Sequence, residues 1–142
     1  MKPELEPFME QLADPEQPWV WMPLDAPPEL WDELAAEARR QGYGVVDLDR
    51  EGEIASQDDL LKAFPTPSRN LNTLKDELCG LPQEGNRGYV LFLRNPDALC
   101  DSDPETFEDF LDIVEVVNDA RVANRMGPFT LVTLDADMAE EA

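Results

Sequence analysis

A short helix predicted over residues 70–79 carries the polar side chains whose spacing best suits binding chemistry. Asn72 and Asp76 are four residues apart, so the helical period places both on one face. An aspartate on a rigid short helix can accept bidentate, charge-assisted hydrogen bonds from an arginine without first being ordered. On the residues alone, Asp76 is more simply explained as a solvated helix acid. Asn72 is equally well explained as a surface asparagine.

Most of the side chains used in hydrolytic and metal chemistry are missing from the sequence. It has no histidine, which excludes hydrolysis through a histidine base and histidine-ligated metal sites. Cys79 and Cys100 form neither a zinc motif nor a disulfide framework, and we expect two reduced thiols. Asp101, Asp103 and Glu105 could hold a divalent ion, but they lack the pattern of a calcium loop and fit a solvated helix start. We therefore predict a protein that is not an enzyme and has no cofactor or metal.

Negative charge dominates the composition, with 32 acidic residues against 11 basic ones and a formal net charge of −21. Nucleic acid and anionic membranes would be repelled by such a protein, whereas a basic protein would be attracted. A nuclease is one such partner, because it must hold phosphates. The charge is equally explained as a means of maintaining solubility.

The elements that would position these groups follow an α/β pattern. Residues 19–48 form a predicted strand-helix-strand unit, which normally gives a parallel pair of strands with a right-handed crossover. Residues 88–94 are a nearly continuous apolar run, as in a central strand covered on both faces. The remaining predicted elements are two short helices opening at Ser56 and Asn70, a long helix over 104–126 and a last strand over 129–134.

Three motifs within this pattern occur in the same order as in a known protein family. They are Val45-Val46-Asp47-Leu48, Ser56-Gln57-Asp58-Asp59-Leu60, and Phe64-Pro65 followed by Asn70-Leu71-Asn72-Thr73-Leu74-Lys75-Asp76-Glu77-Leu78. Together they resemble the barstar family of ribonuclease inhibitors over roughly residues 44–134. The family pattern at the third motif is a proline, a short loop and then Asn-Leu-Asp-x-Leu-x-Asp-x-Leu. The resemblance implies a barstar-like parallel sheet of three strands packed with helices.

The resemblance also implies an inhibitory site. In this family the loop and second short helix plug the nuclease's active-site cleft, and carboxylates stand in for RNA phosphates. Asp76 matches the principal acid of that helix, and Asn72 stands where the family usually has its first acid. Asn70 could contact the partner, but is expected mainly to cap the helix. The other implied contacts are Gly80 and Leu81 at the helix exit and Asp119 on the long helix.

The departures from the family pattern bear on the partner. Asn72 can hydrogen-bond but cannot imitate a phosphate charge, and the loop Thr66-Pro67-Ser68-Arg69 is one residue shorter than in barstar and lacks its aromatic residues. The implied function is a ribonuclease inhibitor or toxin immunity protein that binds a basic microbial ribonuclease or toxin domain. The alternative is an acidic interaction or regulatory module on the same scaffold without nuclease inhibition.

The chain is expected to divide into four parts. Residues 1–17 form an acidic, proline-rich arm of uncertain order, and 18–43 a strand-helix extension that packs on the main domain and adds one parallel strand. The barstar-like domain covers 44–134, and an acidic tail covers 135–142. Trp19, Trp21 and Trp31 are expected in the core rather than on a separate binding surface. Since no run is long enough to span a bilayer and no signal sequence is evident, we expect a cytoplasmic protein. We also expect it to be a monomer.

Overall fold

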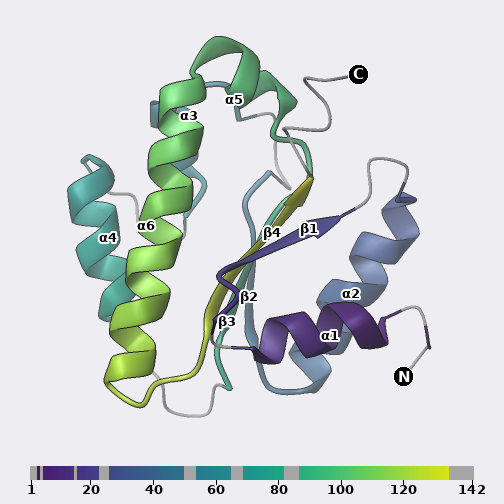
Figure 1. Cartoon of the computed structure of the whole chain (residues 1–142). Helices are drawn as coiled ribbons and strands as arrows, with labels where there is room; N and C mark the ends of the chain where they lie inside the picture. Colours follow the sequence, from purple (N-terminus) through teal and green to yellow (C-terminus); the bar gives the residue numbers. More distant parts are fainter. Residues whose placement is uncertain are drawn as a thin grey trace.

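A four-stranded parallel β-sheet is the centre of the fold in the computed structural model, which describes residues 3, 5–14, 16–22, 26–49, 54–64, 69–81 and 87–134 (Figure 1). The strands pair in the order β1-β4-β3-β2, and each neighbouring pair is parallel. Their bounds are Trp19–Met22 for β1, Gly44–Asp47 for β2, Tyr89–Leu93 for β3 and Phe129–Leu134 for β4. The predicted α/β class is confirmed, and the N-terminal strand adds a fourth parallel strand beside β4.

The two strands of the unit predicted over 19–48 are not neighbours, contrary to the usual arrangement of such a unit. β1 and β2 lie at opposite edges of the sheet, and β4 and β3 lie between them. The inner strands are almost wholly buried, whereas every residue of β2 is only half-buried. Continuous apolar strands take the positions that helices cover on both faces, which leaves the edges to the shorter and less buried strands.

Helices cover both faces of this sheet (Figure 1). One layer contains α1 (Glu6–Ala13) and α2 (Pro28–Arg40). The other contains α3 (Gln57–Lys62), α4 (Leu71–Cys79), α5 (Asp97–Ser102) and α6 (Pro104–Ala123). Alternate residues of β3 point into the two resulting cores, Phe92 toward α2 and Leu91 toward α4 and α6. No helix in the described ranges is both long and apolar enough to cross a bilayer.

The N-terminal segment contributes to the core of the first layer. Leu5, Met9 and Leu12 of the segment containing α1 are buried against α2 and the sheet. Trp31 is also buried, and Trp19 is half-buried with its Nε1 donating to the carbonyl oxygen of Leu111 at 3.1 Å. Trp21 differs from the other two tryptophans, because 39% of it is exposed on the edge strand. The predicted acidic tail, residues 135–142, lies outside the described residues.

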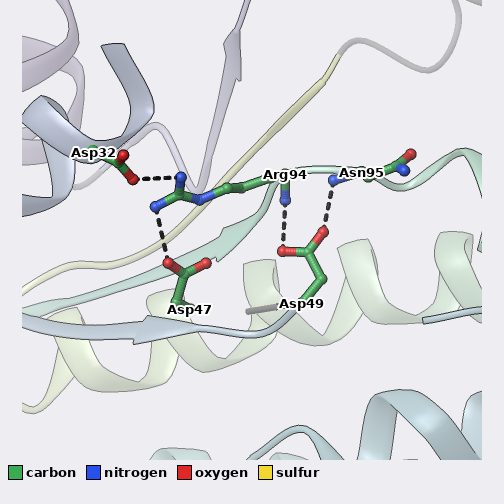
Figure 2. A network of polar contacts seen from close by, with 5 residues as sticks. All are labelled: Asp32, Asp47, Asp49, Arg94 and Asn95. Carbon is green, nitrogen blue, oxygen red and sulfur yellow. Dashed lines mark hydrogen bonds and ion pairs between the residues drawn. The ribbon is translucent and has the colours of Figure 1, made fainter. Parts of the chain in front are cut away.

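An arginine at the carboxyl end of β3 joins three parts of the chain (Figure 2). Arg94 Nη1 lies 2.6 Å from Asp32 Oδ1 on α2, and its Nη2 lies 2.9 Å from Asp47 Oδ2 on β2. The carboxylate of Asp49 accepts hydrogen bonds from the backbone N–H groups of Arg94 and Asn95, at 3.1 and 2.7 Å. These contacts fix the end of the strand to the N-terminal extension.

Replacing this arginine should destabilise the fold. In Arg94→Met the Asp47 side chain, which is only 13% exposed, loses its charged partner. Since a buried polar group without a partner costs about 1–3 kcal/mol, we expect urea denaturation to show a loss of that size in unfolding free energy. Asp32→Asn is the control, because the Asp32 side chain is 69% exposed and an exposed pair contributes only about 0–1 kcal/mol. Equal losses in the two variants would contradict this account.

Candidate functional site

Helix α4 begins with a side-chain cap, as the sequence predicts. Asn70 has an extended backbone, and its Oδ1 accepts hydrogen bonds from the backbone N–H of Thr73 at 2.9 Å and from Thr73 Oγ1 at 3.1 Å. Leu74 and Leu78 face the core, with Leu71 half-buried beside them. The cap and the apolar face together fix which side of α4 points outward.

The outward side of α4 carries the polar residues singled out in the sequence. Asn72 and Asp76 are both exposed, one helical turn apart. Gly80 is exposed at the C-terminal cap, and Leu81 is half-buried after it. Thr66, Pro67 and Ser68 of the preceding loop lie outside the described residues, whereas Arg69 is described and exposed. The carboxylate of Asp76 is therefore accessible from solvent and does not face the monomer's own core.

Helix α6 packs beside α4 and brings a second set of acids near it (Figure 1). Asp119 is exposed on α6. It belongs to an acidic stripe that recurs every three or four residues, formed by Glu105, Glu108, Asp112, Glu115 and Asp119, all of them exposed. In the described part of the chain no ion pair involves these five carboxylates. The candidate site thus combines Asp76 on α4 with Asp119 on the neighbouring helix, whose other exposed acids make that helix strongly negative.

A buried arginine holds the C-terminal end of α4 in place. Arg121 on α6 is 0% exposed, and its Nη1 donates to the carbonyl oxygens of Leu78 at 3.2 Å and Leu81 at 2.9 Å. The guanidinium also lies 5.0 Å from the centre of the Tyr89 ring. A positive charge at this position favours the negative end of the α4 dipole. Burial lowers the pKa of Arg121, yet an arginine stays protonated at neutral pH.

The sequence did not predict that Arg121 binds the end of α4, although its spacing from buried residues on α6 indicated that it would be buried. Arg121 follows Val117 by four residues, so it continues the buried row of α6 formed by Phe110, Val114 and Val117. A charged residue in an apolar row indicates a specific buried partner. Its partners include backbone carbonyls in and just after another helix, and no sequence pattern identifies such acceptors.

A groove between α4 and α6 was also missed. It is a shallow groove with a volume of about 470 Å³, and the residues that line it are Gln57, Asn70, Leu71, Asn72, Lys75, Asp109, Asp112, Ile113 and Val116. Val116 is 48% exposed, which is unusual for a large aliphatic side chain in this molecule. The predicted Asn70 and Asn72 lie on the rim of this groove.

The acidic cluster considered as a metal site has a structural role at Asp103. Its Oδ1 accepts from the backbone N–H of Thr106 at 3.3 Å and its Oδ2 from Thr106 Oγ1 at 2.7 Å, so it caps α6. Asp101 and Glu105 are exposed. Among the described residues, no group of three or more carboxylate or thiol side chains is placed to hold a metal ion.

Comparison with known proteins identifies a family for this chain. A family model described as Barstar (barnase inhibitor) matches residues 52–133, more than half of the chain. The match covers the segment from α3 into β4 and includes Asn72, Asp76 and Asp119. It confirms the resemblance found in the sequence. Searches of curated proteins and of solved structures gave no match.

Arg121 should be required both for stability and for the position of α4. In Arg121→Met the carbonyl oxygens of Leu78 and Leu81 lose a charged donor, and hydrogen bonds to charged groups contribute about 1.5–3 kcal/mol each. We expect urea denaturation to show a loss of at least about 2 kcal/mol, and hydrogen exchange to be fastest in the last turn of α4. If Arg121→Met leaves the unfolding free energy unchanged, apolar packing alone is sufficient to hold this helix end.

Proposed function

Because this chain belongs to the Barstar (barnase inhibitor) family, we propose that it inhibits a basic ribonuclease with the exposed face of α4. Asp76 would enter the cationic groove where the enzyme holds RNA phosphates and accept hydrogen bonds from its arginine or lysine side chains. Asn72, Gly80, Leu81 and Asp119 would surround this contact, and Asn70 would contribute mainly through the helix cap.

The observation that carries this proposal is the exposure of Asp76 on a helix held at both ends. Asn70 caps its start and Arg121 binds the carbonyl groups at its end. A rigid, outward carboxylate loses little conformational freedom when it binds, so more of its interaction free energy remains as affinity. Asp76 is also in a position where a partner can remove it from water, as a strong interface contact requires.

The charge of the whole molecule supports the same partner. A net charge of −21 attracts a basic protein over several ångströms and accelerates encounter. The proposed activity requires no catalysis, since the inhibitor need only exclude the substrate.

Asn72 and Lys75 favour a second candidate function. Asn72 replaces an acid of the family pattern, and Lys75 adds a positive charge on the same helix. A chain with these features, whose loop before α4 also lacks the aromatic residues of barstar, could use the scaffold for another acidic interaction and inhibit no nuclease. Barnase, which the family description names, is the natural first probe, followed by a panel of other basic microbial ribonucleases.

Substitution of the central acid tests the proposal. We expect the wild-type protein to inhibit RNA cleavage by at least one enzyme of the panel, and Asp76→Asn to weaken that inhibition by about 2–5 kcal/mol, as for a charged partner removed from a desolvated pair. Titration of the nuclease with a fluorogenic RNA substrate measures the inhibition constant. Glu10→Gln is the matched control, because it removes an equal charge from an exposed position on α1, across the sheet. Inhibition that is equally strong in Asp76→Asn would exclude Asp76 as the anchor, and no inhibition of any enzyme would favour the second function.

Salt should separate the long-range attraction from the contact itself. Screening shortens the reach of surface charges to about 3 Å at 1 M salt, from about 10 Å at 0.1 M. We therefore expect the association rate with the inhibited nuclease to fall at least about tenfold over this range, while the dissociation rate changes less. Stopped-flow fluorescence measures both rates. An association rate independent of salt would show that the charge of −21 has no part in binding.

A further inference from the structure

The groove between α4 and α6 combines an apolar floor with an acidic side. Leu71, Ile113 and Val116 supply the apolar surface, and Asp109 and Asp112 stand beside it. Along α6, Asp109, Ile113 and Val116 follow one another at intervals of four and three residues, so they form one row facing α4. Val116 lines this surface and is 48% exposed to solvent.

The α6 side of the groove carries carboxylates that have no ion-pair partner among the described residues. In the described residues, neither Asp109 nor any carboxylate of the acidic stripe forms an ion pair. Like charges three or four residues apart destabilise a helix by about 0.2–0.5 kcal/mol per pair. A cation placed over this helix would relieve that repulsion.

We propose that this groove binds a long cationic side chain, arginine or lysine, of the same basic ribonuclease that meets α4. Its aliphatic stem packs on Ile113 and Val116, and its charged end pairs with Asp112 and Asp109. This inference rests on the proposed function and specifies which nucleases the protein selects: those with a cation placed one helix away from the catalytic groove.

The chemistry of the groove favours this occupant over the alternatives. A second copy of the chain has the same charge of −21 and would be repelled, as would nucleic acid. A purely apolar side chain could pack in the groove but would form no ion pair or hydrogen bond with Asp109 and Asp112. An arginine or lysine satisfies both the aliphatic floor and the carboxylates.

Lys75 lines the same groove and carries a positive charge. Its ammonium group is the cation among the residues that line the groove, so it repels an incoming cation. The groove therefore predicts effects of opposite sign: removal of an acid weakens binding, and removal of Lys75 strengthens it.

Four variants measured with the nuclease that the wild-type protein inhibits test the inference. For a partly desolvated charge pair, we expect Asp112→Asn to raise the inhibition constant about threefold to tenfold. Val116→Thr, which retains the side-chain shape, should raise it about threefold, and Lys75→Gln should lower it by about the same factor. Glu115→Gln is the matched control on the same helix, because it removes one charge outside the lining and should change the constant less than about twofold.

The outcomes distinguish this inference from the proposed function. Equal effects of Asp112→Asn and Glu115→Gln, with no effect of Val116→Thr, would overturn the groove contact, while a loss in Asp76→Asn would leave the function intact. Inhibition of no nuclease by the wild-type protein would overturn both. The Val116 methyl resonances give an independent measurement, since a side chain packed on them must shift their NMR signals on binding. Unshifted methyl signals in a formed complex would overturn the groove contact.

Discussion

The hydrogen bonds from Arg121 to the end of α4 are the interaction on which the candidate site depends. The guanidinium is fully buried in α6 and binds carbonyl groups at Leu78 and Leu81, so it joins the two helices that carry the exposed acids. A buried cation is costly unless it is well hydrogen-bonded, and so the position of α4 is closely specified. The apolar contacts of Leu74 and Leu78 could tolerate small shifts of the helix, whereas the directional bonds of a guanidinium cannot.

The hydrogen bonds of Arg121 help to explain how a small domain maintains a surface on which many acidic side chains repel one another. The acids of α6 destabilise one another, and their cost is offset by the core beneath them, where Phe110, Val114 and Val117 are fully buried. The N-terminal extension adds a second core on the other face of the sheet, and Arg94 links it to β2. Stability therefore comes from two apolar layers and two arginines, which leaves the outer side of α4 and α6 free to carry acid.

Local patterns predicted much of this arrangement. The Asn70 and Ser56 caps, the apolar faces of the short helices and the apolar run of β3 depend on neighbouring residues, and each is found in the structure. The order of strands was not accessible in the same way, because β1 is separated from its partner β4 by more than a hundred residues. Helix α5 was missed because Asp97–Ser102 is short and follows a proline with little helical periodicity. The acceptors of Arg121 and the exposure of Val116 depend on how helices pack, which no local pattern contains.

The distribution of charge between the two helices indicates how an inhibitor of this kind would meet its partner. Lys75, Asp76 and Glu77 give α4 a net charge of only −1, whereas six acids and Arg121 give α6 a net charge of −5. A contact limited to α4 would use little of the electrostatic attraction that the composition provides. Since Asn72 has also removed one acid from α4, a basic enzyme gains most when its surface extends over α6 as well. In the proposed complex, the carboxylates of α6 would therefore compensate for the acid that α4 lacks at Asn72.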